Sequence, residues 1–231
     1  MTMSSPLNEE AARVLVETLR LGRFERSVEL TDIALKARVS GSFTKEVLTN
    51  ILGTVDDTRI SLGSTSRVRI AVEAARAGRL KDAAQAISWQ EFEKFGEQCL
   101  EEAEFRTKRN VRVKGEGRAW QIDLVGSRGE LIIAIDCKHW NTPSYISRFK
   151  LAAEHQRHAT LHLLATVKDR RQALAVILTL REPPAQLSED TILVSVEKLP
   201  SFLGTVTPYA ENLPFMTSPL AVVENPMSQS S

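Results

Sequence analysis

The sequence predicts an α/β protein in which a mostly helical N-terminal segment precedes a core built on a mixed sheet. Residues 1–87 carry apolar residues at helical spacing, interrupted by glycine and serine. From residue 88 the pattern changes to a helix, three strands, a long helix and a further strand, in the order αβββαβ. We therefore expect three parts: residues 1–87, residues 88–203, and a proline-rich, partly disordered tail over residues 204–231.

Composition excludes several classes of protein. Among 231 residues, 30 Lys and Arg face 29 Asp and Glu, which gives a net charge of +1. The sequence shows no signal peptide and no apolar run that could span a membrane, so we expect a cytoplasmic protein without a membrane partner. Cys99 and Cys137 lack a paired spacing, which excludes a disulfide framework and a four-cysteine metal site. The absence of a phosphate-binding glycine loop argues against an ATP-driven enzyme.

The N-terminal segment has the spacing of a helix-turn-helix. We expect helices over residues 8–21, 29–37, 42–52, 68–77 and 80–87. The second and third are joined by Arg-Val-Ser-Gly, and a weak strand signal over residues 58–62 would supply a wing. The third helix would then contact DNA through Ser42, Thr44, Lys45, Thr49 and Asn50. A plain helical bundle that contacts a protein partner is the alternative.

The core begins at a clear helix start signal. Ser88-Trp89-Gln90-Glu91 has the form of a capping box. An apolar stripe follows it, made of Trp89, Phe92, Gly96, Cys99, Leu100 and Ala103. Strands are expected over residues 111–114, 120–126, 131–138, 173–180 and 191–197. Between the third and fourth strands, Asn141-Thr142-Pro143 would open a long helix that ends near residue 167.

Two carboxylates and an ammonium group lie on neighbouring strands. Ser127-Arg128-Gly129-Glu130 is typical of a hairpin turn, which places Asp123 opposite or diagonal to Asp136, with about 5–8 Å between Cβ atoms. Asp136 and Lys138 share a strand face. Alternation also predicts one face with Gln121, Asp123 and Val125 and another with Trp120, Ile122 and Leu124. Close carboxylates repel each other unless a hard cation such as Mg²⁺ bridges them, and a nearby lysine can hold or deprotonate a water.

With these residues in place, the chain resembles the PD-(D/E)XK restriction-endonuclease-like nucleases over residues 88 to about 203. Within that superfamily it is most similar to the Mrr-type restriction endonucleases and the archaeal Holliday junction resolvases. The segments that carry the resemblance are WQEFEKFGEQCL, QIDLVG and ELIIAIDCKHW. The chain departs from the motif at Ile122, where proline is expected, and at Asp136, where glutamate is more usual.

The resemblance implies a catalytic role for each of the acids and for the amine. Asp123 and Asp136 would bind Mg²⁺, with Mn²⁺ as a substitute, and Lys138 would orient the attacking water. The further metal ligands would be Glu93 from the first helix of the core, with Glu97 as the second choice for that role, and the main-chain carbonyl of Cys137.

Basic residues on both sides of the acidic pair in the sequence indicate a polyanionic partner. Gln121, on the strand of Asp123, and His139, directly after the lysine, are further candidates for contact with substrate. The DNA-contact candidates are Lys45, Asn50, Arg106, Lys108, Arg109, Lys114, Arg118, Gln121, His139 and Lys150.

Our leading hypothesis is a metal-dependent DNA endonuclease that acts in restriction, repair or recombination on duplex or branched DNA, as a homodimer. A DNA partner would make the protein nucleoid-associated. One alternative is a protein that recognises DNA structure through a nuclease-like domain with weak or no cleavage. Another is an RNA-processing nuclease, which shares the chemistry, although the helix-turn-helix favours DNA.

His155, His158 and His162 recur at helical spacing on the expected long helix. Such a stripe can in principle bind zinc. No cysteine or carboxylate completes a tetrahedral set, so we favour a polar face that gains charge at mild acidity.

Overall fold

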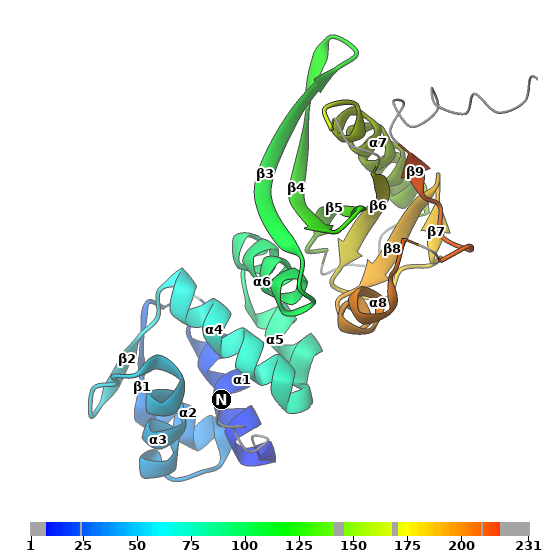
Figure 1. The fold of residues 1–231 in the computed structure, drawn as a ribbon. Helices are drawn as coiled ribbons and strands as arrows, with labels where there is room; N and C mark the ends of the chain where they lie inside the picture. Colours follow the sequence, from blue (N-terminus) through cyan, green and yellow to red (C-terminus); the bar gives the residue numbers. More distant parts are fainter. Residues whose placement is uncertain (1–7, 24, 141–145, 168–170, 209, 218–231) are drawn as a thin grey trace, which may run out of the picture. The chain divides into compact units, whose positions relative to one another are not determined.

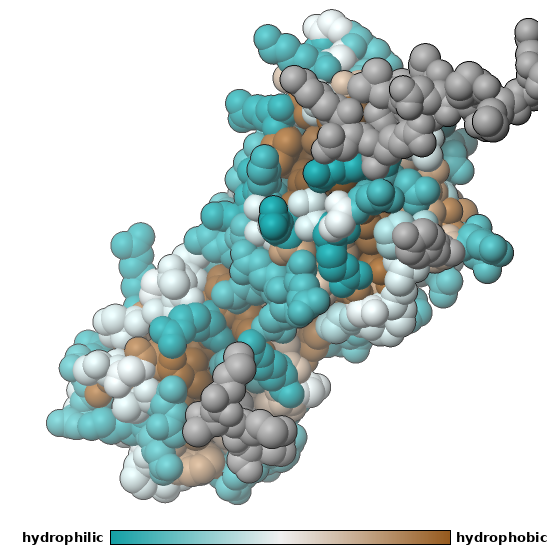
Figure 2. Space-filling model, in the orientation of Figure 1, coloured by the Kyte–Doolittle hydropathy of each residue, from teal (hydrophilic) through white to brown (hydrophobic). Residues whose placement is uncertain are grey.

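The structure, a computed structural model, describes residues 8–23, 25–140, 146–167, 171–208 and 210–217. The chain divides into two compact units, Met1–Phe95 and Gly96–Ser231 (Figure 1). No helix within the described residues is long and apolar enough to cross a membrane. On the face shown in Figure 2, hydrophobic side chains appear only as patches among hydrophilic ones. The expected helix start at residues 141–143 and the end of the tail, residues 218–231, lie outside the described residues.

The first unit is mostly helical, as the sequence predicts. Its elements are α1 (Glu9–Leu21), β1 (Ser27–Glu29), α2 (Leu30–Ala37), α3 (Gly41–Leu52), β2 (Arg59–Ser61), α4 (Ser64–Ala74), the π-helical segment η1 (Ala75–Arg79), α5 (Leu80–Ala86) and the start of α6 (Trp89–Glu102). The fourth helix begins four residues before the expected start. Within η1 the backbone of Gly78 has a positive φ of 81°, a conformation that glycine adopts without steric penalty.

The core of this unit consists of large aliphatic side chains from four helices. Leu15 and Leu19 of α1, Ile33 of α2, Leu48 of α3 and Ile70 of α4 are all fully buried. Each helix therefore packs one apolar face inward, and this burial is the main source of the unit's stability.

Helices α2 and α3 are joined by a tight turn. Arg38 adopts the left-handed conformation with φ 57°, and the Ser40 hydroxyl caps α3 by accepting from the amide of Phe43 at 3.2 Å. The short strands β1 and β2 pair antiparallel beside them. Thr44 is fully buried and donates to the Ser40 carbonyl at 3.1 Å. The expectation that Thr44 contacts DNA is therefore wrong, because its hydroxyl satisfies the backbone inside the unit.

Helix α6 starts with the capping box that the sequence predicts. The Ser88 amide donates to Glu91 at 2.8 Å, and the Glu91 amide donates to the Ser88 hydroxyl at 3.3 Å. Glu91 also forms an ion pair with Arg67 at 2.9 Å, with both side chains 7% exposed. Trp89 does not belong to the apolar stripe, since it is 58% exposed at the first position of the helix. Phe92 is the first fully buried residue of that stripe.

The second unit is a mixed sheet with helices. Its strands are β3 (Arg106–Gly115), β4 (Arg118–Arg128), β5 (Leu131–Lys138), β6 (Gln172–Thr179), β7 (Leu187–Ser188), β8 (Thr191–Ser195) and β9 (Met216–Thr217), and its further helices are α7 (Ile146–Ala165) and α8 (Leu199–Thr205). The strand order is β3-β4-β5-β6-β8-β7, with β9 also paired to β6. Strands β3, β4 and β5 are antiparallel neighbours, whereas β5, β6 and β8 are parallel. This architecture confirms the predicted mixed α/β fold.

Several local predictions need correction. The first strand begins at Arg106, five residues before the expected start. The hairpin between β4 and β5 is closed by the pair Arg128↔Leu131, so the loop consists of Gly129 and Glu130. The tail, predicted to be only partly disordered, contains one short strand, since β9 pairs with β6 through Met216↔Ala173.

Strands β5 and β6 form the buried centre of the second unit. Residues 131–135 and 173–179 are buried, which fits the continuous apolar runs in the sequence. Helix α7 covers one face, where the buried amide of Gln156 donates to the Ala134 carbonyl at 2.8 Å. On the other face Gly96 of α6 lies close to the sheet, since an added Cβ would lie 3.0 Å from Leu124. The sheet is thus held between α6 and α7.

Candidate active site

Along β4, the alternation of residues that face α7 is broken at Asp123. Trp120 and Ile122 pack in the apolar cluster under α7, and so does Val125, although strict alternation would place it on the opposite face from Ile122. Leu124 instead lies next to Gly96 of α6. The predicted assignment of strand faces is therefore wrong beyond Asp123.

The physical reason lies on the partner strand. Asn110 adopts the left-handed conformation with φ 52°. The register of β3 and β4 contains the pairs Arg109↔Leu124 and Val111↔Ile122, but it skips Asn110 and Asp123, which lie between them. Arg109 consequently turns toward α6, where it pairs with Glu97, whereas Val111 packs against the α7 cluster. Asn tolerates this backbone conformation better than most residues. The hairpin thus bends at the position of the first candidate acid.

The two acids and the lysine meet where β4 and β5 separate. The last pair of these strands is Leu124↔Ile135, so Asp123 and Asp136 follow directly after it. Asp123 accepts a hydrogen bond from the Cys137 amide at 2.8 Å. The Lys138 ammonium lies 2.8 Å and 2.7 Å from the two carboxylate oxygens of Asp136. The structure therefore brings together the three side chains that the sequence singles out.

The electrostatics of this group depend on burial and on mutual repulsion. The pKa of Asp123 is raised to about 6, chiefly by burial and also by the charge of the neighbouring Asp136. The hydrogen bond from Cys137 and the charge of Lys138 act in the opposite direction. Because two carboxylates compete for one lysine in a partly buried place, a divalent cation would stabilise the doubly ionised state.

The candidate acids of α6 have different surroundings. Glu93 is 8% exposed and belongs to the unit that ends at Phe95, so its role beside the aspartates stays a prediction. Glu97 forms an ion pair with Arg109 at 2.8 Å and accepts from the Thr107 hydroxyl at 3.4 Å. These contacts satisfy Glu97 locally, which makes it the weaker candidate for a metal ligand.

Three of the predicted DNA contacts line one groove. This groove, of about 840 Å³, lies along β3, β4, β5 and the end of α7. Its basic residues are Arg106, Lys108, Arg112, Lys114 and Arg171. Five positive side chains along one groove match the charge of a nucleic-acid backbone.

The other predicted contacts are dispersed. Lys45 pairs with Asp57, and Lys150 lies 3.4 Å from Glu189. Arg118 stacks over the Trp120 ring at 3.5 Å. The remaining members of the set are Asn50 and Gln121, which are exposed, His139, which is partly buried, and Arg109, which is paired as described.

His155 of α7 is a neighbour of the acidic group that the sequence argument did not place there. Its ring lies 5.0 Å from that of Trp120. Burial lowers the pKa of His155, and the charges of Arg118 and Lys138 lower it further, while Asp123 has the opposite effect. The only sequence signal was its place in the histidine stripe.

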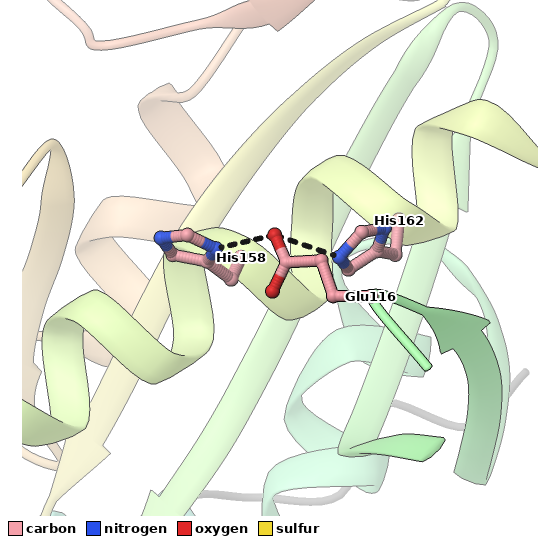
Figure 3. A group of neighbouring side chains, drawn as sticks. All are labelled: Glu116, His158 and His162. Atoms are coloured by element: carbon pink, nitrogen blue, oxygen red, sulfur yellow. Dashed lines mark hydrogen bonds and ion pairs between the residues drawn. The ribbon is translucent and has the colours of Figure 1, made fainter. Parts of the chain in front are cut away.

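A carboxylate does lie beside the other two histidines of that stripe. Glu116, in the turn between β3 and β4, has an oxygen 3.4 Å from His158 Nδ1 and 3.6 Å from His162 Nε2 (Figure 3). The statement that no carboxylate completes the set is therefore wrong, because the hairpin carries Glu116 to α7 from a distant point in the sequence.

This fold and this acidic group define a restriction-endonuclease-like domain. Residues 84–181 match the restriction endonuclease family model Mrr_cat. The match is consistent with the PD-(D/E)XK restriction-endonuclease-like superfamily.

Comparison with curated proteins and with solved structures gives no further assignment. No curated protein matches the chain. Two solved structures are similar: the protein of unknown function AF1548, with 24% identity over 42% of this chain and 53% of its own, and VC1899 from Vibrio cholerae, with 11% identity over 87% and 56%. Their TM-scores are 0.33 and 0.39, and the chain spans about half the length of each.

Proposed function

We propose that the protein is a metal-dependent DNA endonuclease that hydrolyses phosphodiester bonds. The observation that carries the proposal is the convergence of Asp123, Asp136 and Lys138 at the point where β4 and β5 separate. The match of residues 84–181 to a restriction endonuclease family supports the same chemistry.

The donor set suits a hard divalent cation. Two adjacent carboxylates offer oxygen ligands of the kind that Mg²⁺ and Mn²⁺ prefer. The pKa of Asp123 is raised by burial and also by repulsion from Asp136, and a bound cation would offset both effects. The residues that would hold it are Asp123 and Asp136, with the Cys137 carbonyl and Glu93 as further candidates. When bound, the ion would polarise the phosphate and stabilise charge on the leaving oxygen.

Lys138 would act on the attacking water. Its ammonium group is fixed by both oxygens of Asp136, so it is directed toward the acidic group rather than free in solvent. A cation at this position can orient a water by hydrogen bonding and favour its deprotonation.

DNA would be held by both units. In the second unit the basic groove supplies Arg106, Lys108 and Lys114 for the phosphate backbone. In the first unit α2, the turn and α3 have the order of a helix-turn-helix, with β1 and β2 beside it, and the exposed Asn50 lies on α3. Replacing Asn50 and Lys45 with alanine should weaken DNA binding without loss of the fold, as measured by fluorescence anisotropy and circular dichroism.

Cleavage of both strands would use two copies of the chain. One acidic group per chain serves one phosphodiester at a time, so a symmetric dimer is the simplest arrangement for a double-strand cut. Sedimentation of the protein alone and with a short duplex tests this part of the proposal, and a monomer that makes only single-strand nicks would contradict it.

The nuclease activity is tested with supercoiled plasmid. The protein is incubated with Mg²⁺, with Mn²⁺ or with chelator, and the products are separated on agarose. Nicked or linear DNA is expected with either metal and not with chelator. Lys138→Ala should lower the cleavage rate by about 100-fold or more, since a positioned acid–base group contributes roughly 10²–10⁴.

A matched control is Asp190→Asn. Asp190 is exposed and pairs with Arg157 at 3.3 Å, so its replacement should leave cleavage unchanged. Retarded but intact plasmid under every condition would instead show a DNA-binding protein without nuclease activity. A panel of linear, methylated, flapped and four-way DNA, with matched RNA duplexes, would identify the substrate.

A further inference from the structure

We propose that Glu116, His158 and His162 form a second metal site, selective for a divalent transition ion such as Zn²⁺. The three residues come from the turn between β3 and β4 and from α7 (Figure 3). Their ligand atoms all lie within 4.8 Å of one another. The site shares no residue with the candidate nuclease site and does not depend on nuclease activity.

The spacing of the ligand atoms fits a tetrahedral ion. Zinc lies about 2.0–2.1 Å from imidazole nitrogen and about 2.0–2.2 Å from carboxylate oxygen, which places neighbouring ligand atoms about 3.3–3.5 Å apart. The Glu116 oxygen lies 3.4 Å from His158 Nδ1 and 3.6 Å from His162 Nε2. These distances exceed those of a good hydrogen bond, about 2.7–3.2 Å, but match two edges of such a tetrahedron.

The two histidines are held in place by their surroundings. The His158 ring stacks on Trp120, with centroids 5.6 Å apart and an interplanar angle of 13°. His162 packs against Gly115, where an added Cβ would overlap its imidazole ring. The Trp120 indole in turn donates to the Gly115 carbonyl at 3.1 Å. The hairpin and α7 therefore preorganise both rings, which lowers the entropy lost when a ligand binds.

One nitrogen of the cluster lacks a hydrogen-bond partner. His162 Nε2 is buried and, within the described part of the chain, makes no hydrogen bond. A buried nitrogen without a partner is unfavourable, and a metal ion would satisfy it. The Glu116 side chain is 54% exposed, so an ion can enter from solvent and keep a water as its fourth ligand.

The ligand chemistry separates this site from the candidate nuclease site. Two imidazoles and one carboxylate suit Zn²⁺, Co²⁺ or Ni²⁺, whereas paired carboxylates suit Mg²⁺ or Mn²⁺. An ion bound to Glu116 and to both histidines would link the tip of the hairpin to α7. We therefore expect it to restrain the β3–β4 hairpin, which also carries Asp123.

The test is a metal titration of the full chain at about pH 7.5, where free imidazole is mainly neutral. Excess Mg²⁺ is present throughout to occupy the carboxylate site. Zn²⁺ binding is followed by calorimetry and Co²⁺ binding by its visible absorption, which is characteristic of tetrahedral coordination. One ion per chain is expected. His162→Gln and Glu116→Gln should each weaken binding by about 100-fold or more, since loss of even an outer-shell partner costs roughly 10–100-fold.

The matched control is His155→Gln. His155 belongs to the same histidine stripe and also lies beside Trp120, but it is outside the proposed site. Its replacement should therefore leave the Zn²⁺ affinity unchanged. Zn²⁺ should also slow amide exchange over residues 115–118 in the wild type and not in Glu116→Gln. Absence of stoichiometric binding to the wild type, or equal affinity in Glu116→Gln, would overturn the proposal. Because Glu116 lies in an exposed turn, its variant remains informative even if His162→Gln fails to fold.

Discussion

Replacement of Asp123 by asparagine should make the metal-free protein more stable at neutral pH. In the folded protein burial raises the pKa of this carboxyl to about 6, against about 3.9 in an unfolded chain. The difference of roughly 2 units corresponds to about 3 kcal/mol at 1.36 kcal/mol per unit. Because the side chain is only partly buried, solvent screening reduces the expected effect to about 1–2 kcal/mol. An asparagine oxygen can still accept from the Cys137 amide.

The direction in which stability changes with pH follows from proton binding. Below about pH 4 the carboxyl is protonated in both states, and its contribution to stability is fully present. Between about pH 4 and 6 the folded state retains a proton that the unfolded state releases, so stability falls as the pH rises and then levels off. The asparagine variant lacks this slope.

The assay is urea unfolding with chelator at several values between about pH 4 and 7, with the wild type and Asp123→Asn compared at each. The free energies of unfolding of the wild type and Asp123→Asn should differ in the upper part of this pH range. Added Mg²⁺ should then stabilise the wild type at neutral pH and leave the variant unchanged, by mass action on the folded state. A variant that is less stable than the wild type at pH 7, or that keeps the same pH slope, would refute the reasoning.

Three further predictions concern stability and reactivity. Glu91→Leu leaves the buried Arg67 without its counter-charge, so the free energy of unfolding should fall by about 3–5 kcal/mol in urea titrations. Gly126→Ala places a Cβ 2.9 Å from a side-chain methyl carbon, and the same measurement should show a loss of about 1–3 kcal/mol. Burial raises the pKa of Cys99 to about 12, so alkylation of the native protein at about pH 8, followed by mass spectrometry, should be roughly 1,000-fold slower than for a free thiol.

The sequence predicted the features that arise from local chemistry. The capping box at Ser88 and Glu91 forms as expected because both partners lie within one helical turn. The hairpin signal near Gly129 and the apolar run of β6 likewise predicted neighbouring strands in the correct orientation. Together these place Asp136 and Lys138 next to Asp123.

The features that the sequence did not predict depend on tertiary geometry. Strand alternation could not reveal the bend at Asn110 and Asp123, because a left-handed residue in mid-strand leaves no pattern of its own. Glu116 lies far from His158 in the sequence, and only the length of the β3–β4 hairpin brings them together. Helical spacing predicted that Trp89 belongs to the apolar stripe of α6, but at the first position of the helix its side chain is exposed.

The most direct test of the central claim compares Asp136→Asn with the wild type for both DNA binding and cleavage. The variant removes one carboxylate of the pair and the counter-charge of Lys138. We predict Mg²⁺-dependent plasmid nicking by the wild type, nicking by the variant reduced to the level seen with chelator, and DNA affinities that agree within about twofold. Undiminished metal-dependent nicking by Asp136→Asn would contradict the account.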